Sequence, residues 1–201
     1  MSAEPTEPKN QFKPMTLALA GVGALSALAA LLPESQRPWN VALVGSVGLF
    51  AAARLSLRQA AVVLALTVAI KDASIYIAFD WPPEPFSWLA YGAYVLFGRL
   101  WLRNTESPLL IGSAAISGSF LFFLISNFGS WLAQAQPYGY SPAGLLNCYE
   151  AAIPFYRGTL ISDLFGTATL FSLHAVLSRA YFPAERVAYV PATQMVDESG
   201  S

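Results

Sequence analysis

Three ionisable side chains lie inside apolar segments, where they could carry chemistry. Lys71 and Asp72 are adjacent in one segment, and Asp163 lies in another. If both segments are helices, Lys71 lies about eight residues, or roughly 12 Å, from the helix end at Phe79, and Asp163 lies about four residues, or roughly 6 Å, below the same surface. A charge in apolar surroundings costs several kcal/mol unless it is paired or hydrated. We therefore expect both helices to turn these groups inward.

Two roles for these charges remain open. In the cheapest arrangement Lys71 extends toward Asp163 and forms an ion pair that only fixes helix packing. Alternatively, two facing polar stripes could line a small pocket that opens outward. Asp72 and Asp163 are the only carboxylates that could converge for acid–base catalysis, and the neighbouring lysine makes charge balance the simpler reading. The stripes comprise Thr67, Lys71 and Ser74 in one segment and Thr159, Asp163, Gly166, Thr167, Leu170 and His174 in the other.

Other reactive residue types give weaker signals. His174 has no Cys, His or carboxylate at ligand spacing, so the pattern favours helix packing over metal binding. Cys148 is the single cysteine, cannot form an internal disulfide, and is expected to be a small half-buried residue. The sequence contains no G-x-S-x-G, no H-E-x-x-H and no phosphate-binding glycine loop. We expect no catalytic residue, no metal and no cofactor.

The composition predicts an integral membrane protein. Of 201 residues, 55% are hydrophobic and 11% are charged, and the mean hydropathy is +0.49, which is too apolar for a soluble domain of this length. Apolar runs of the length that crosses a bilayer predict an all-α bundle of six transmembrane helices. The spans are Met15–Leu32, Asn40–Ala53, Ala60–Phe79, Phe86–Trp101, Leu109–Phe128 and Thr159–Leu177. The second and fourth are short, and their boundaries are the least certain.

Basic residues predict the orientation of this bundle, because Lys and Arg accumulate in short cytoplasmic loops. Six spans place Lys71 within a span and leave Arg37 and Arg157 outside. Both termini are then cytoplasmic. The basic residues on the cytoplasmic side are Lys9, Lys13, Arg54, Arg58, Arg99, Arg103, Arg179 and Arg186. With a pI near 5.8 and no basic cluster, nothing indicates nucleic-acid binding.

The longest gap between spans, residues 129–158, is rich in aromatic residues. Its apolar stretch Ala143–Ile153 is too short to cross the membrane and contains Glu150. An amphipathic or re-entrant segment over the outer mouth of the bundle explains both features. The alternative is an aromatic belt at the membrane interface. In the first reading the candidate ligand-binding residues, besides Lys71, Asp72 and Asp163, are Asn127, Trp131, Tyr149 and Glu150.

The remaining features concern helix packing and the chain ends. Ala20, Ala24 and Ala27 give the first span a small-residue face that lets another helix approach closely, either within the bundle or from a partner subunit. Packing within the chain is favoured. Residues 1–14 are expected to be a disordered cytoplasmic tail, 15–182 the membrane domain, and 183–201 a C-terminal cytoplasmic tail.

Two long stretches carry a resemblance to known proteins. FFLISNFGSWL at Phe122–Leu132 and GLLNCYEAAIPFYRGTLISDLF at Gly144–Phe165 resemble the C-terminal signature of a family of uncharacterised six-helix bacterial inner-membrane proteins. PWNVALVGSVGLFAAARLSLRQAAVVLALTVAIKDA at Pro38–Ala73 is similar to the first half of that family. The resemblance covers most of residues 38–178 and implies a multi-pass protein of the bacterial inner membrane.

A looser resemblance, in helix count and layout, is to the substrate-binding (S) components of energy-coupling-factor transporters. It implies a pocket opening outward and a first helix that docks a coupling subunit. We therefore expect a non-enzymatic subunit in the lipid bilayer that binds a small solute beneath residues 129–158 and delivers it inward with an energising partner. The alternative, from a different class, is a structural or accessory subunit of a membrane complex that binds no ligand.

The predicted topology can be tested by cysteine labelling. Single cysteines introduced near Ser35, Glu84 and Gln136 should react with a membrane-impermeant reagent added from outside, whereas cysteines near Ser56 and Thr105 should not, because the basic loops face the cytoplasm. Labelling of either inner position from outside would contradict the six-span arrangement.

Overall fold

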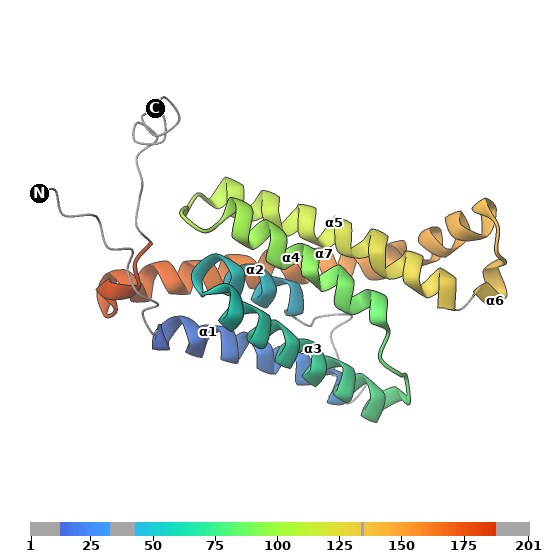
Figure 1. The fold of residues 1–201 in the computed structure, drawn as a ribbon, viewed down its shortest axis with the longest axis horizontal. Helices are drawn as coiled ribbons and strands as arrows, with labels where there is room; N and C mark the ends of the chain where they lie inside the picture. The colour runs from blue at the N-terminus through green and yellow to red at the C-terminus, as the bar shows by residue number, and fades with distance from the viewer. Residues whose placement is uncertain (1–12, 33–42, 134, 188–201) are drawn as a thin grey trace, which may run out of the picture.

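The structure is a computed structural model that describes residues 13–32, 43–133 and 135–187, and these residues fold into a long helical bundle (Figure 1). The predicted all-α class is confirmed, since no strand occurs in those ranges. The predicted tails lie mostly outside them. The elements are α1 (Pro14–Leu25) with the 3₁₀ continuation η1 (Ser26–Leu31), α2 (Val44–Arg54), α3 (Leu57–Phe79), α4 (Pro85–Trp101), α5 (Pro108–Ala133), α6 (Ala135–Tyr138), α7 (Pro142–Ala180) and η3 (Pro183–Glu185).

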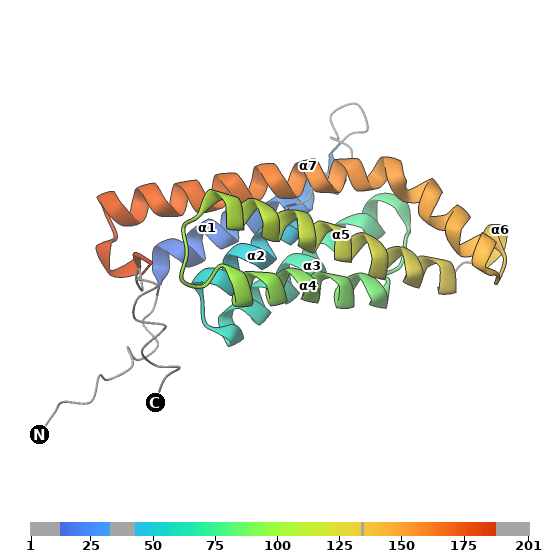
Figure 2. The ribbon, with the colours of Figure 1, turned by 90° about the horizontal axis from the view of Figure 1, so that it is seen from above.

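Each predicted span falls on one of these helices, and the helices run up and down along the bundle axis (Figures 1 and 2). Four helical segments are long and apolar enough to cross a membrane: Pro14–Leu31, Leu57–Phe79, Pro108–Ala133 and Pro142–Ala180. The two shorter helices, α2 with 11 residues and α4 with 17, are the spans whose apolar runs were already short in the sequence.

Local sequence signals explain where several helices begin and end. Ser56 and Gln59 form a reciprocal capping box at the start of α3. The Glu84 side chain accepts hydrogen bonds from two backbone N–H groups at the start of α4, and Ser141 accepts one from Gly144 at the start of α7. Asp80 ends α3 in the left-handed conformation, with φ of 53°. Short polar residues therefore set the helix ends inside an otherwise apolar sequence.

Helix α2 forms the centre of the bundle. All of its residues are buried, and it packs against α1, α3, α4, α5 and α7. Small residues on α2 and its neighbours let the backbones approach closely. At the crossing with α4, a Cβ added to Gly98 would lie 2.5 Å from the Leu49 carbonyl oxygen. A helix enclosed on every side needs small residues at its crossings, because bulky side chains would push the neighbouring helices apart.

Lys13, Arg54 and Arg99, three of the basic residues predicted for the cytoplasmic side, lie together at one end of this bundle. The Lys13 ammonium donates to the Arg54 carbonyl at 2.8 Å, and the Arg54 guanidinium donates to the carbonyls of Leu102 and Thr105 at 2.6 and 2.7 Å. Burial, followed by the positive charge of Arg54, lowers the pKa of Lys13. The network ties the start of α1, the end of α2 and the α4–α5 connection to one another.

Residues 129–158 differ from the predicted loop. Helix α5 continues to Ala133, and α7 begins at Pro142 and runs for 39 residues beside α5 (Figure 2). The apolar stretch 143–153 is thus the first part of the helix that contains the sixth predicted span. Pro154 lies inside α7 and removes one backbone N–H donor, which bends a helix without necessarily ending it. The segment extends the bundle and does not form a loop over it.

The small-residue face of the first helix is covered by the protein itself. Ala20, Ala24 and Ala27 are buried, and their helix packs against α2, α3 and α7. This agrees with the favoured prediction of packing within the chain. It leaves these three residues unavailable to a partner subunit, because neighbouring helices already occupy the space that a partner would fill.

The C-terminal tail predicted to begin at residue 183 is folded at its start. Glu185 in η3 is buried, and its carboxylate accepts hydrogen bonds from the backbone N–H groups of Met15 and Thr16 at 3.0 and 2.9 Å. It also accepts the Thr16 hydroxyl at 2.6 Å. The first N–H groups of a helix have no partner within the helix and carry partial positive charge. Glu185 therefore caps α1 from the opposite end of the sequence.

We predict that Glu185→Ala lowers the free energy of unfolding by about 1–3 kcal/mol, because it leaves buried donors at the start of α1 unsatisfied. Glu185→Gln retains one acceptor oxygen and should lose less. Thermal unfolding in detergent measures both, with the exposed Glu150→Ala as the control, expected within about 0.5 kcal/mol of the wild type. An unfolding midpoint for Glu185→Ala equal to that of the control would contradict the cap.

Candidate functional site

Asp163 lies at the centre of the bundle and is 1% exposed. The Tyr94 hydroxyl on α4 donates a hydrogen bond to Asp163 Oδ2. The Ser46 hydroxyl on α2 donates to the backbone carbonyl of Asp163 at 3.0 Å. Side chains from two neighbouring helices thus hold this segment of α7 in place, and the carboxyl group faces the interior, as the sequence predicted.

Glycines on two helices make room for Tyr94. A Cβ added to Gly45 would lie 2.5 Å from the Tyr94 ring and 2.5 Å from Asp163 Oδ1. A Cβ added to Gly118 on α5 would lie 2.7 Å from the same ring. Tyr94 is completely buried. A buried tyrosine hydroxyl requires a hydrogen-bond partner, and Asp163 supplies it.

The predicted pairing of Lys71 with Asp163 is wrong. Lys71 Nζ lies 2.6 Å from Oδ1 of the adjacent Asp72, whose Oδ2 accepts the Trp88 indole N–H at 2.7 Å. Lys71 also lies over the Tyr91 ring, 5.4 Å from its centroid. The polar stripes of α3 and α7 do not face each other, because α2 packs against both helices. Lys71 therefore finds its counter-ion on its own helix and contributes no charge to Asp163.

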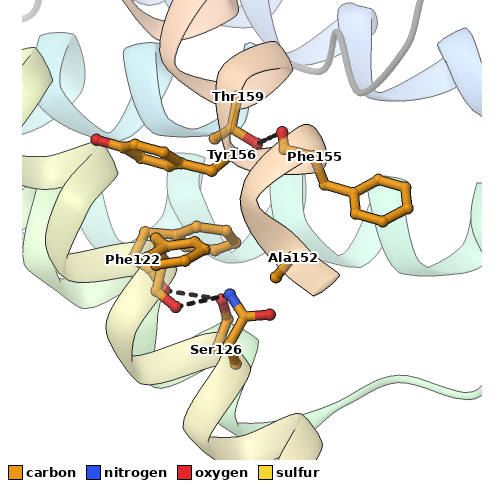
Figure 3. Close-up of a pocket in the computed structure, with 8 residues that line it drawn as sticks. Phe122, Ser126, Ala152, Phe155, Tyr156 and Thr159 are labelled. Atoms are coloured by element: carbon orange, nitrogen blue, oxygen red, sulfur yellow. Dashed lines mark hydrogen bonds between the residues drawn. The ribbon is translucent and has the colours of Figure 1, made fainter. Parts of the chain in front are cut away.

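A cavity of about 180 Å³ lies between α5 and α7 (Figure 3). Half of its lining residues are aromatic. The Tyr156 side chain from α7 reaches toward α5 and Phe122, whereas Phe155 points away from both (Figure 3). The Phe123 and Tyr156 rings lie 4.8 Å apart between centroids. The lining residues are Phe122, Phe123, Ser126, Asn127, Ala152, Phe155, Tyr156 and Thr159.

Helical spacing places this cavity next to Asp163. Asp163 follows the lining residue Thr159 by four residues, one turn along the same face of α7. On α5, Ser119 precedes the lining residues Phe122 and Ser126 by three and seven residues, again on one face. The Tyr156 hydroxyl lies near Ser119 and interacts electrostatically with Asp163. Tyr156 thus lines the cavity and also adjoins the buried carboxyl group.

Ser119 lies at the inner end of this site. It is completely buried, and its hydroxyl lies close to the Tyr94 and Tyr156 hydroxyls and to the Asp163 carboxyl group. Nearby polar groups are satisfied by their own helix: the Ser126 hydroxyl donates to the Phe122 carbonyl at 2.8 Å, and the Asn127 amide donates to the Phe123 carbonyl at 2.7 Å. Ser119 therefore belongs to the cluster of hydroxyl groups around the buried Asp163 carboxyl group.

The other predicted ligand residues, Asn127 and three residues of the 129–158 segment, have different surroundings. Asn127 lines the cavity, and Tyr149 packs against Phe123 while its hydroxyl donates to the Leu124 carbonyl at 2.8 Å. The Trp131 indole donates to the Gly139 carbonyl at 3.0 Å, which fastens the outer turn, and Glu150 is exposed. Of these four residues, Asn127 and Tyr149 lie at or beside the cavity, whereas Trp131 and Glu150 do not line it.

The other polar residues of α7 lie deeper, along its buried face. Thr167 and His174 are each 1% exposed, and Thr167 Oγ1 and His174 Nε2 have no hydrogen-bond partner within the described ranges. His174 packs edge to face against Phe50, at 5.6 Å between centroids, as expected of a packing residue. Across residues 13–32, 43–133 and 135–187, no three His, Cys, Asp or Glu side chains gather as metal ligands would.

Four residues of this site, Tyr94, Ser119, Phe122 and Tyr156, were not among the predicted site residues. Ser119, Phe122 and Ser126 follow one face of α5, so their periodicity carries a signal. It is hard to separate from ordinary packing, because serines in membrane helices often bond their own backbone. No sequence pattern around Tyr94 indicated that it belongs to the site. Its importance depends on Gly45, Gly118 and Asp163, which come from three other helices.

A family model described as a family of unknown function, DUF6580, matches residues 10–189. No curated protein and no solved structure matches the chain.

We predict that Tyr94→Phe and Asp163→Ala are energetically coupled, because each removes one side of the same buried hydrogen bond. A double-mutant cycle of unfolding free energies should give an interaction energy of about 0.5–3 kcal/mol. The matched cycle of Lys71→Met with Asp163→Ala should be additive within about 0.5 kcal/mol. Strong coupling of Lys71 with Asp163 would show that these two groups are partners after all.

Proposed function

The chain belongs to this DUF6580 family of unknown function, and from its own residues we propose that it is a membrane subunit that captures a small solute. The observation that supports this function best is the aromatic cavity between α5 and α7, which adjoins a fully buried carboxyl group. Ligand sites are concave, mostly apolar, and carry a few convergent polar groups. The cavity has this character, with Ser119, Tyr156 and Asp163 at its inner end.

We further propose a six-span arrangement in the bacterial inner membrane, with both termini in the cytoplasm. The arrangement adds α2 and α4 to the four long apolar helices. Its support is the gathering of Lys13, Arg54 and Arg99 at one end of the bundle, where basic residues favour the cytoplasmic side. With 11 residues, α2 is about 16 Å long and crosses only part of the hydrocarbon layer, which a buried helix can do.

In this orientation the cavity lies in the outer half of the membrane, since Asn127 and Ala152 lie toward the end of the bundle opposite the basic residues. Solute would enter between α5 and α7 near the bend at Pro154. We propose binding and transport, not catalysis, because the polar groups around the cavity include no nucleophile paired with a base. Delivery across the membrane would require an energising partner subunit.

Such a partner would have to dock elsewhere than on the first helix face of Ala20, Ala24 and Ala27, since these residues are buried within the chain. This difference weakens the likeness to energy-coupling-factor S components, whose first helix carries the docking face. It does not affect the solute site, which lies between α5 and α7.

A structural or accessory subunit without a ligand is the second candidate. The observation that favours it is the self-contained Lys71–Asp72 pair, completed by the Trp88 indole, which has no group left over for a solute. In this role Asp163 and Tyr94 serve only to join α4 to α7. Stoichiometric co-purification with a larger membrane complex, together with no response to any solute, would favour this function.

We predict that Ala152→Leu abolishes solute capture, because Ala152 lines the cavity and a larger side chain fills it. Ala151→Leu, one residue earlier and exposed, is the matched control and should behave as the wild type. Thermal shift of the purified protein against a panel of amines, amino acids, nucleobases and vitamins is the measurement. Saturation at about 100 times the dissociation constant should add roughly 2.7 kcal/mol. The proposed capture function is contradicted if no compound raises the unfolding midpoint of the wild type, or if the Ala152→Leu and Ala151→Leu variants show the same midpoint shift.

A further inference from the structure

The charges buried in the middle of the bundle do not balance. Lys71 forms an ion pair with Asp72, in which Nζ lies 2.6 Å from Oδ1. Asp163, by contrast, has no Lys, Arg or His within ion-pair distance among the described residues, and the Tyr94 hydroxyl is the hydrogen-bond donor to its carboxyl group. A carboxyl group in apolar surroundings is either protonated or matched by a cation. The protein supplies no cation at Asp163.

The cavity lies about one helical turn from this carboxyl group. Thr159 and Tyr156 line it, and Asp163 follows them by one and two turns on the same face of α7. The Ser119 hydroxyl is completely buried and lies beside the Asp163 carboxyl group. A hydroxyl oxygen accepts hydrogen bonds. Ser119 and Asp163 together therefore place acceptor oxygens about one helical turn beyond the lining residues of a cavity that has no cation of its own.

The cavity walls also favour a positively charged solute. Phe122, Phe123 and Tyr156 present aromatic rings, and aromatic faces attract organic cations. No lining residue is basic, so an anionic solute would meet a carboxyl group and no positive charge. The volume of about 180 Å³ equals that of about six water molecules. Only a small molecule fits.

We propose that the solute is a small organic cation, an ammonium group on an apolar or aromatic body. This inference rests on the proposed solute-capture function and names the chemical class for the same cavity. The body lies against Phe122, Phe123 and Tyr156. The ammonium group donates hydrogen bonds toward Ser119 and the Asp163 carboxylate, while Tyr94 holds that carboxylate in place.

The experiment uses three probes that share one body and differ in charge: phenethylamine, 2-phenylethanol and 3-phenylpropanoate. Binding to the full-length protein in detergent is followed by thermal shift and by isothermal titration. The wild type should bind the amine at least roughly tenfold more tightly than the alcohol, the range expected of hydrogen bonds to a charged group, and should not bind the carboxylate. Asp163→Asn should reduce the amine-to-alcohol preference to about onefold.

Controls separate this inference from its premise. Asp72→Asn removes a buried carboxylate away from the cavity and should keep the preference for the amine. Ala152→Leu should lose the amine, and Ala151→Leu should keep it. If the alcohol or the carboxylate binds as tightly as the amine, the cavity captures solutes but the cation inference is overturned. The same holds if Asp163→Asn keeps the preference. If none of the probes binds the wild type, the cation inference is overturned, and the broader compound panel then decides on solute capture itself.

Discussion

The arrangement of the whole bundle depends on a short helix that is enclosed on every side. Helix α2 buries all of its residues, and glycines such as Gly45, Gly48 and Gly98 allow the surrounding helices to approach it. Within a membrane no hydrophobic force drives helices together, so close contact and hydrogen bonds must hold the bundle. The hydroxyl of Ser46 and the guanidinium of Arg54 supply such bonds at two points of α2. Helix α2 is therefore a packing partner that α1, α3, α4, α5 and α7 share.

This central helix also explains how the two buried acidic groups come to differ. Asp72 on α3 meets Lys71 and Trp88, while Asp163 on α7 meets Tyr94, and α2 packs against both of their helices. The Asp72 carboxylate is neutralised by the adjacent lysine. The Asp163 carboxyl group has hydroxyl groups around it and a cavity nearby. A difference of this kind between chemically identical side chains is typical of sites in which one group is structural and the other is available for function.

The sequence allowed the all-α class and the positions of six helical segments to be predicted, because apolar runs and helix-capping residues are local signals. It also placed Asp163 in the interior. It failed where the answer depended on contacts between distant residues. The partner of Asp163 is Tyr94, 69 residues away, and the spacing of charges alone pointed to Lys71. Residues 129–158 were predicted to be a gap between spans, because the apolar stretch 143–153 was too short to cross a membrane and contained Glu150. In the structure residues 142–158 instead form the first part of the helix that contains the sixth span.

The buried carboxylate of Glu185 has a consequence for the biosynthesis of the protein. It caps the first turn of α1, from which it is separated by 170 residues. Because the ribosome makes the N-terminal end first, the leading N–H groups of α1 lack this cap until the residues after α7 have been made. The contact between α1 and Glu185 is therefore the last of the described contacts of α1 that can form. Folding intermediates should lack this cap, and the start of α1 is where a quality-control protease should cut them first.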